Sequence, residues 1–490
     1  MLNAIRYLVL PVLNSLGPVF MWLSLAMCVP LVTSLAKTDG AHRGFIVCIT
    51  VSALIGALLT FGLARWRREL SARHGFLLVT LTWGLVPLLS VIPLHYALPD
   101  VGLAALYFET MSCLTTTGGT VLTGLDQLPL SINGLRCLLS WVGGMGLIVL
   151  SVAILPLLGV GGAQIIKAEV SGPLKETKLT PRIADTAKAL YIIYLGISVA
   201  CTIAYHLAGM SWDDAVLHMM TTVSLSGISA HDASFAFFNS ANIDWVATAF
   251  MALCGFNFAL HFGAWHQRNP FIYFFDVEAR AWLIFLLVTI LVVAGVLWAK
   301  GLYTDPLTAL RHAAFAVTST ASTSGFTSAN WEIWPFGIPV LLILSSCFAT
   351  SGGSTGGGLK MIRLLILFKL IRRELMQLLY PKASLPIMLN GGAVSQPLLL
   401  AVVGFILAWI VSAVFIALLL LLSGMGATEA FSASISCLSN LGPGLGEVGP
   451  TGNYAGLNTF QYWLCAFAML IGRLEIFTVF VLTTRAFWRT

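Results

Sequence analysis

Long apolar stretches recur from one end of the chain to the other, separated by short polar segments. Most of them reach the roughly 20 residues that an α-helix needs to cross a bilayer. The pattern therefore predicts an all-α polytopic membrane protein with about ten spanning helices. They cover residues 16–36, 44–64, 75–97, 134–160, 189–209, 244–265, 279–300, 334–371, 397–423 and 459–485. We expect the first stretch to be retained, because no small-residue cleavage site closes it.

Four other apolar segments are too short to cross the bilayer, and each lies between two spanning stretches. They cover residues 101–114, 212–224, 306–321 and 427–438. Two begin with residues that start helices: Ser211 precedes the second segment, and Asp305 precedes Pro306 at the first position of the third. We expect half-membrane helices that re-enter from the outside, since irregular backbone at that depth must be buried in protein or line water.

Each short segment is followed by a run of small polar residues that closes on a glycine. These glycines, Gly118, Gly227, Gly325 and Gly442, are roughly a hundred residues apart. Glycine lets the backbone turn carbonyl oxygens toward an axis, and rings of carbonyls replace the water shell of a cation. The sequence thus predicts a pseudo-fourfold pore built from four repeats, each with a spanning helix, a pore helix, a glycine loop and a second spanning helix. The limits are 1–74 for a leading helical hairpin and 75–188, 189–278, 279–396 and 397–490 for the repeats.

The stretch 334–371 is too long to be one helix, because it would measure about 57 Å against an apolar core of about 30 Å. Five glycines fall within nine residues of its middle, and each weakens a helix by about 1 kcal/mol relative to alanine. We interpret the segment as an irregular loop near mid-membrane and a candidate gate. A tight helix crossing of the GxxxG kind is the alternative. The residues are Thr350, Ser351, Gly352, Gly353, Ser354, Thr355, Gly356, Gly357 and Gly358.

Two charges, Arg473 and Glu475, lie inside the last apolar stretch. A charge within the membrane usually faces a cavity or a charged partner. Arg473 is therefore a candidate electrostatic barrier to a passing cation, or a partner of the glycine-rich loop. A salt bridge from Arg473 to Glu475 or to another helix is the alternative.

The composition, 58% hydrophobic and 9% charged, excludes an ordinary soluble domain. With both termini in the cytoplasm, five of the 26 basic residues fall outside, in agreement with the positive-inside rule. Twelve of the 20 acidic residues lie outside, among them Glu109, Asp126 and Asp232. These carboxylates either concentrate cations at a pore mouth or merely solvate the outer loops. The nine cysteines form no CxxC pair and indicate neither a zinc site nor a disulfide framework.

The motifs resemble those of the TrkH branch of the Trk/Ktr/HKT superfamily of potassium transporters, over essentially the whole chain. The matching segments are 115–120, 227–232, 322–327, 352–360, 440–444 and 472–477. In that family the backbone before each of the four glycines coordinates potassium. The resemblance implies this role for Thr116, Thr117 and Gly118; Leu225, Ser226 and Gly227; Thr323, Ser324 and Gly325; and Asn440, Leu441 and Gly442.

The resemblance further implies that residues 350–358 form the family's gating loop and that Arg473 is its pore arginine. It implies potassium uptake across the bacterial inner membrane, a homodimer, and regulation by a cytosolic nucleotide-binding ring of the TrkA type. The chain itself carries no Gly-rich nucleotide fingerprint. Potassium is then the transported ion, and we expect no bound cofactor, no nucleic-acid partner and no catalytic residues.

Several functional alternatives stay open. Uptake is driven by the membrane potential or is coupled to protons, for which His218 and His312 in the pore helices are candidates unless they only cap or pack. The loops lack the Thr-Val-Gly-Tyr-Gly run of tetrameric potassium channels, which favours looser exclusion of sodium. An ATP-driven pump would need a separate ATPase chain, because no P-loop is present. An enzyme is disfavoured, since His261 and His266 are poorly spaced for metal ligands.

Overall fold

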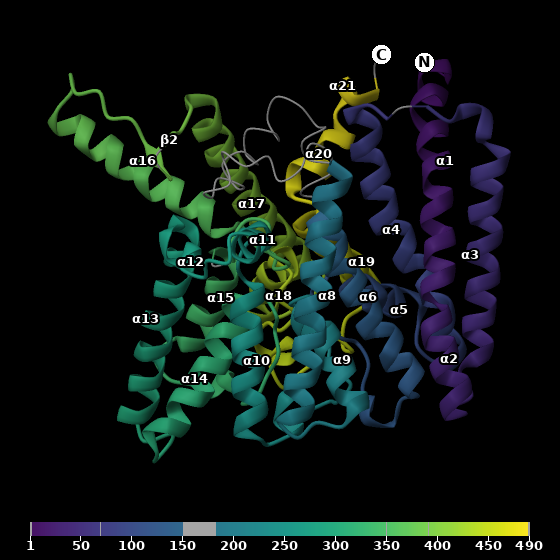
Figure 1. Cartoon of the computed structure of the whole chain (residues 1–490), viewed down its shortest axis with the longest axis horizontal. Coiled ribbons are helices and arrows are strands. Elements are labelled where there is room, and N and C mark those ends of the chain that lie inside the picture. Colours follow the sequence, from purple (N-terminus) through teal and green to yellow (C-terminus); the bar gives the residue numbers. More distant parts are fainter. Residues whose placement is uncertain (1, 69, 150–182, 349, 391, 489–490) are drawn as a thin grey trace.

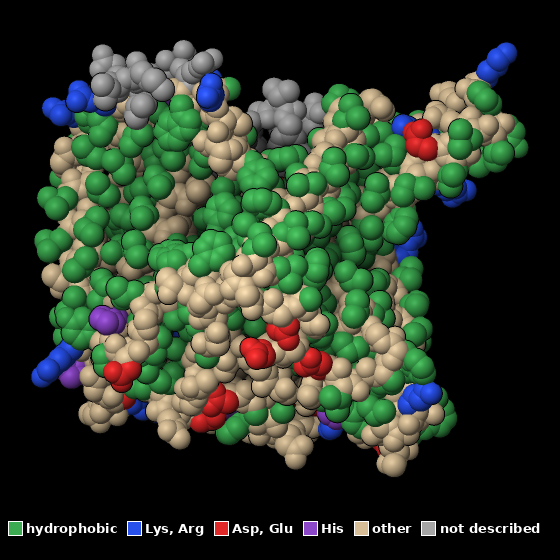
Figure 2. Space-filling model, turned by 180° about the vertical axis from the view of Figure 1, so that it is seen from behind, with side chains coloured by type: hydrophobic (Ala, Val, Ile, Leu, Met, Phe, Trp, Pro, Cys, Tyr) green, Lys and Arg blue, Asp and Glu red, His purple; other side chains and the backbone are tan. Residues whose placement is uncertain are grey.

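The computed structural model of the chain describes residues 2–68, 70–149, 183–348, 350–390 and 392–488. These residues form a bundle of mostly parallel and antiparallel helices, with the N- and C-termini at the same end (Figure 1). Hydrophobic side chains cover the middle of the bundle surface, as Figure 2 shows, and many large ones are exposed there. Such a belt suits lipid rather than water. The fold confirms the predicted all-α polytopic membrane class.

Among the described residues, six helical stretches are long and apolar enough to cross a membrane, and two bent helix pairs each add another. The six are α1 with α2 (Leu2–Ala26, Cys28–Lys37), α3 (His42–Gly62), α4 (Ala72–Ala97), α8 (Ile183–Leu207), α13 (Val277–Ala299) and α17 (Gln396–Leu422). The predicted span 134–160 begins in α6 (Leu130–Val149), and its remainder lies outside the described residues. The division of the chain into a hairpin and four repeats stays a prediction.

The first helix begins earlier than its hydropathy predicts. α1 starts at Leu2 and passes through Pro11 and Pro18, so the predicted start at residue 16 is wrong. Prolines are tolerated in membrane helices because neighbouring helices satisfy the freed backbone groups. α1 packs closely on α3, where a side chain at Gly17 would collide with the carbonyl of Gly56. Both helices also pack on α4, at the edge of the bundle (Figure 1).

Four short pore helices occupy the centre of the bundle. They are α5 (Leu103–Leu114), α9 (Trp212–Val223), α14 (Pro306–Ala321) and α18 (Ala427–Ser439), close to the predicted segments. The expected caps are present, since Ser211 accepts a hydrogen bond from Asp214 N at 3.1 Å and Asp305 accepts one from Thr308 N at 2.9 Å. Each glycine loop is followed by a second helix, called an inner helix below: α6, α10, α15 and α19. Pore helices and inner helices contact one another in the order α5, α6, α9, α10, α14, α15, α18, α19 and back to α5. These eight helices therefore close into a ring.

Three inner helices of this ring are broken, although the hydrophobic pattern predicts one break. α10 (Ala241–Cys254) and α11 (Phe258–His266) meet at 91°, and α19 (Thr459–Arg473) and α20 (Ile476–Thr483) meet at 112°. The predictions of continuous helices over 244–265 and 459–485 are therefore wrong. The predicted break within 334–371 is present between α15 (Ile338–Phe348) and α16 (Met361–Leu379).

The two unpredicted breaks have local causes. Asn257 starts α11 by accepting a hydrogen bond from Ala259 N at 2.8 Å, which is the geometry of an N-cap. Gly255 lies so close to the indole ring of Trp282 that a side chain would collide with it. At the second break, Glu475 has a φ of 59°, outside the helical region. Single residues thus end helices that hydropathy presents as continuous.

The remaining elements are short. A 3-10 turn follows each glycine loop: η2 (Leu125–Gln127), η6 (Ser234–Phe237), η7 (Trp331–Ile333) and η8 (Gly446–Val448). Another, η1 (Ala64–Trp66), follows α3, while α12 (Ile272–Phe275) precedes α13 and α21 (Arg485–Trp488) ends the described chain. An antiparallel hairpin, β1 (Met388–Leu389) with β2 (Gly392–Ala393), lies beside α16, which projects at the end that holds the termini (Figure 1).

Candidate functional site: four glycine loops and the loop beneath them

The four pore helices end in the same way. The residue two before each glycine is left-handed, with φ of 53° at Thr116, 54° at Leu225, 61° at Thr323 and 55° at Asn440. The following residue donates its backbone N–H to the carbonyl five residues back, at 2.8–2.9 Å in every loop. This is the Schellman closure of a helix end. Four different sequences thus adopt one backbone conformation.

The four glycines form a ring in which each lies against the next loop. Their φ values are 88°, 72°, 81° and 101°, in a region that glycine populates without strain. A side chain at any of them would collide with a carbonyl oxygen of the adjacent loop. The pairs are Gly118 with Ser226, Gly227 with Ser324, Gly325 with Leu441 and Gly442 with Thr117. All twelve residues predicted to bind potassium are therefore brought together.

Side chains of these loops hydrogen-bond to the structure around the ring. Ser226 Oγ donates to Ser140 Oγ on α6 at 2.8 Å. Asn440 Nδ2 donates to the carbonyl of Met469 on α19 at 3.0 Å and to Thr117 Oγ1 at 2.9 Å. Polar side chains therefore anchor the second loop to α6, and the fourth loop to α19 and to the first loop.

An open hollow, called the outer hollow after the topology that the sequence predicts, lies against the ring, and all four glycines line it together with Arg136, His231 and Asp232. Of the acidic residues expected at the mouth, Asp232 lines the hollow, and Asp126 forms an ion pair with His231. Glu109 is fully buried and pairs with Arg136, so its placement at a solvated mouth is wrong.

His231 bridges two carboxylates at this mouth. Its Nδ1 contacts Asp126 Oδ1 at 2.5 Å and its Nε2 contacts Asp214 Oδ1 at 3.1 Å. Burial lowers the pKa of His231, but the hydrogen bonds to Asp214 and Asp126 outweigh burial and raise the pKa above the ordinary 6.5. His231 therefore links Asp126, which follows the first glycine loop, to Asp214 at the start of α9, and these contacts favour its protonated form.

The glycine-rich loop of residues 350–358, called the inner loop below, lies directly beneath the pore-helix ends. Thr355 Oγ1 donates to the carbonyl of Val223 at 3.1 Å, and Gly357 N donates to Thr323 Oγ1 at 2.8 Å. Gly357 also lies so close to the carbonyl of Ser439 that a side chain would collide with it. The inner loop therefore touches the ends of three pore helices. It is irregular, and the alternative of a continuous helix crossing is wrong.

Arg473 is buried and bound to backbone carbonyls. Its Nη1 donates to Thr355 O in the inner loop at 2.9 Å, and its Nη2 donates to Gly143 O on α6 at 3.2 Å. Glu475 is bound instead by Arg363, at 2.9 Å. The alternative of a salt bridge between Arg473 and Glu475 is therefore wrong, and Arg473 contacts the candidate gate directly.

Sequence reasoning missed two residues that hold the inner loop. The buried Glu278 at the start of α13 accepts hydrogen bonds from Gly352 N in the inner loop at 2.7 Å and from Ile362 N in α16 at 3.1 Å. Asn257, at the break between α10 and α11, lies against Gly353. The sequence did offer one signal for Glu278, an acidic residue in the first turn of an apolar helix. It gave no indication that the partner of Glu278 is Gly352, which is 74 residues away.

The two pore-helix histidines are held by protein groups. The ring of His218 contacts the carbonyl of Asp214 at 2.9 Å and Ser229 Oγ at 3.0 Å. His312 contacts Arg311 at 3.0 Å and stacks on Tyr303. Neither is among the residues that line the outer hollow. Their geometry favours packing over proton transfer.

Comparison with known proteins identifies the family of the chain. A family model described as TrkH, a cation transport protein, matches residues 41–489. The chain is 42% identical over 483 residues to the Trk system potassium uptake protein TrkH of Halomonas elongata, across 98% of this chain and 99% of that protein. It is 40% identical over 464 residues to TrkH of Escherichia coli K12, across 94% and 96%. The crystal structure of the potassium transporter TrkH from Vibrio parahaemolyticus matches with a TM-score of 0.91 and 39% identity, covering 98% of this chain and 100% of that chain.

Proposed function

Because the chain belongs to the TrkH family of cation transport proteins, we propose that it takes up potassium across the bacterial inner membrane through its ring of glycine loops. The relatives described above are named potassium uptake proteins, which are transporters and not enzymes. The observation that carries the proposal is the ring itself, in which each glycine packs on a carbonyl of the next loop. A ring of this kind has room for carbonyl oxygens but not for side chains.

In this proposal the ring is the selectivity filter. Cations collect in the outer hollow beside Asp232, exchange water for backbone carbonyls of the twelve ring residues, and pass inward. The membrane potential is a sufficient driving force, because about 100 mV supplies about 2.3 kcal/mol per charge. Coupling to protons would need a titratable group on the path, and the positions of His218 and His312 do not favour it.

The inner loop and Arg473 together form the proposed gate. The loop lies beneath the pore-helix ends, and Arg473 places a positive charge against it through the carbonyl of Thr355. A buried cation near the path repels a passing potassium ion. If the inner loop moved out of the pore, it would unblock the path and also remove the carbonyl of Thr355 from Arg473.

We further propose that the chain forms a homodimer and is regulated by a cytosolic nucleotide-binding ring of the TrkA type. The end that holds the termini is the cytoplasmic one in this proposal. There α16 projects beside the β hairpin and carries Lys369, Arg372 and Arg373 (Figure 1). This placement agrees with the positive-inside rule.

A flux assay tests the proposal against its alternatives. Purified chain in liposomes with an imposed potential is expected to pass potassium without nucleotide hydrolysis. Transport only after an ATPase chain is added would favour the ion-translocating subunit of a pump. Equal sodium and potassium flux would favour a sodium-permeable cation transporter, and a pH gradient that drives uptake without a potential would favour proton coupling.

A further inference from the structure

A buried ion pair lies behind the first glycine loop. Arg136 on α6 and Glu109 on α5 are 1% and 0% exposed, and Arg136 Nε lies 2.8 Å from Glu109 Oε1. A buried pair of this kind adds little net stability, because taking two charges out of water offsets most of their attraction. The pair is therefore of interest for the groups that it holds in place and not for its contribution to stability.

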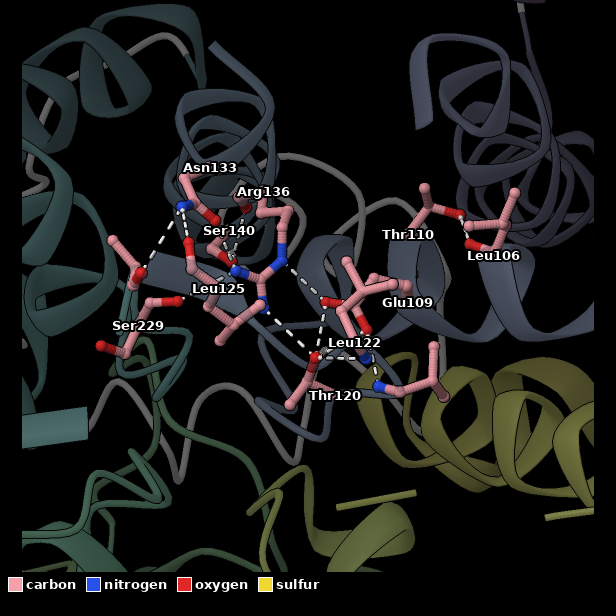
Figure 3. Close-up of polar contacts among 12 residues, drawn as sticks. Leu106, Glu109, Thr110, Thr120, Leu122, Leu125, Asn133, Arg136, Ser140 and Ser229 are labelled. Carbon is pink, nitrogen blue, oxygen red and sulfur yellow. Dashed lines mark hydrogen bonds and ion pairs between the residues drawn. The ribbon is translucent and has the colours of Figure 1, made fainter. Parts of the chain in front are cut away.

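The pair is hydrogen-bonded to the outgoing strands of two adjacent glycine loops (Figure 3). Thr120, two residues after Gly118, donates its hydroxyl to Glu109 at 3.0 Å, and Val121 N donates to the same carboxylate at 2.9 Å. Arg136 Nη1 donates at 2.9 Å to the carbonyl of Ser229, two residues after Gly227. One guanidinium therefore spans the first and second repeats.

Asn133 extends the same arrangement. It accepts a hydrogen bond from Arg136 Nη1 at 2.9 Å and donates from Nδ2 to the carbonyl of Leu125 at 2.9 Å. Figure 3 shows the Arg136 side chain between Asn133 and Ser229 on one side and Glu109 and Thr120 on the other. The planar guanidinium fixes the directions of these bonds, which a lysine ammonium cannot do.

The other half of the ring is supported differently. The residue nine positions before the glycine is Glu109 in the first repeat and His218 in the second, and each bonds the hydroxyl two positions after its glycine. The third and fourth repeats have Ala316 and Ala433 at this position. There the described hydroxyl bonds run from Ser319 to the carbonyl of Phe326, and from Tyr454 to that of Gly442, both at 2.7 Å.

We propose that Glu109, Thr120, Asn133, Arg136 and Ser229, called the Arg136 network, are positioning residues that set the preference of the ring for potassium over sodium. The inference rests on the proposed function of the ring as a filter. In the cavity-size account of selectivity, a filter excludes the smaller cation when its carbonyls cannot close in around it. The Arg136 network fixes the separation of the first two loops, so their carbonyls cannot approach one another to bind sodium.

The experiment compares potassium and sodium flux in liposomes for the wild-type chain, Arg136→Lys, Thr120→Val and Gly118→Ser. Arg136→Lys keeps the charge and loses the fork, and we expect the potassium-to-sodium flux ratio to fall about tenfold, equivalent to about 1.4 kcal/mol. Thr120→Val removes one hydroxyl from the network with little change of volume, and we expect a fall of about threefold. Arg311→Gln is the matched control, because Arg311 pairs with Asp244 at 3.5 Å, between α14 and α10.

Each outcome decides the inference. A lower ratio in Thr120→Val with a nearly unchanged melting temperature supports it, and so does a lower ratio in folded Arg136→Lys. A lower melting temperature with an unchanged ratio overturns it and makes the network a structural support only. If Arg136→Lys does not fold, Thr120→Val decides alone. If Gly118→Ser also keeps the wild-type ratio, the filter assignment fails and the inference fails with it. A lower ratio in Gly118→Ser alone overturns the inference and leaves the proposed function standing.

Discussion

The ring of glycine loops and the inner loop are in direct contact, yet they differ in how the chain forms them. The ring takes an equivalent piece from each of four repeats, with the same left-handed residue, the same helix-end bond and the same glycine. The inner loop comes from the third repeat alone. Four equivalent carbonyl sets suit ion binding, whereas one asymmetric segment can move without the other repeats.

The contacts that hold the ring also differ from those that hold the inner loop. Each glycine of the ring is held by the backbone of the adjacent loop, so a change in one loop reaches the next. The inner loop is held by the side chains of Glu278 and Arg473, which bind its backbone. Two backbone hydrogen bonds also tie it to the break between α10 and α11, from Ser351 N to Gly255 O at 3.0 Å and from Phe258 N to Gly353 O at 3.1 Å. The ring is therefore expected to be sensitive to volume at its glycines, and the inner loop to be sensitive to single charges.

The largest effect is expected from Gly118→Ser. The new Cβ would overlap the carbonyl of Ser226, and a left-handed non-glycine residue adds strain of about 1–3 kcal/mol. We expect the potassium-to-sodium flux ratio to fall about 100-fold, equivalent to about 2.7 kcal/mol. Gly134→Ala is the matched control, because that glycine has open space around it. A wild-type ratio in well-expressed Gly118→Ser would show that the ring does not select ions.

Arg473→Ala tests the inner loop and should have the next largest effect. It removes a positive charge and the bond to Thr355 O, so basal potassium flux without a cytosolic partner should rise about tenfold. Repulsion between unit charges about 4 Å apart at an effective dielectric of about 20 is about 4 kcal/mol, which is an upper limit for the barrier.

Flux through Arg473→Ala is measured as potassium uptake into liposomes at a fixed potential, beside Arg485→Ala as a control at the chain end. A decrease in flux in folded Arg473→Ala would make this arginine a support for the pore and not a barrier.

Glu278→Gln should raise basal flux about threefold, since a neutral amide accepts the backbone hydrogen bonds from Gly352 in the inner loop and Ile362 in α16 more weakly than a carboxylate does. Asp305→Asn, at an exposed helix cap away from the inner loop in the sequence, serves as the control. If flux were unchanged in Glu278→Gln but raised in Arg473→Ala, the contact of Arg473 with the inner loop would control the gate and the contact of Glu278 would not.

The smallest effect is expected from His231→Gln, measured as a melting-temperature difference from wild type across pH. The pKa of His231 is raised, so its ion pairs stabilise the fold below pH 6.5 and this contribution is lost as the pH rises through the folded-state pKa. The pKa of Asp126 is lowered by its hydrogen bond to His231 despite burial, so the same contribution is also lost in acid, below the ordinary value of 3.8.

The melting-temperature difference should therefore be largest near pH 5 to 6, where the loss of unfolding free energy is about 1 kcal/mol or less because Asp126 is 41% exposed. His266→Gln provides the control. A difference that grows toward alkaline pH would contradict the charged bridge.

Local signals predicted the pore helices and the glycine loops well. Asp305 with Pro306 marks a helix start, and a small polar run ending in glycine marks a Schellman end. The break at Asn257 was not predicted, because one cap within an apolar stretch does not change its hydropathy. The ion pair of Glu109 and Arg136 was not predicted either, since its partners are 27 residues apart and only the fold brings them together.

The closure of the ring within one polypeptide has a genetic consequence. A homotetrameric pore repeats every residue four times, so one mutation alters the whole circumference. Here Gly442 of the last repeat packs on Thr117 of the first, so a mutation in one codon alters one loop and its contact with the next, and not all four loops at once. Selection can therefore adjust ion preference in small steps, and a loop can diverge in sequence as long as its own glycine is kept.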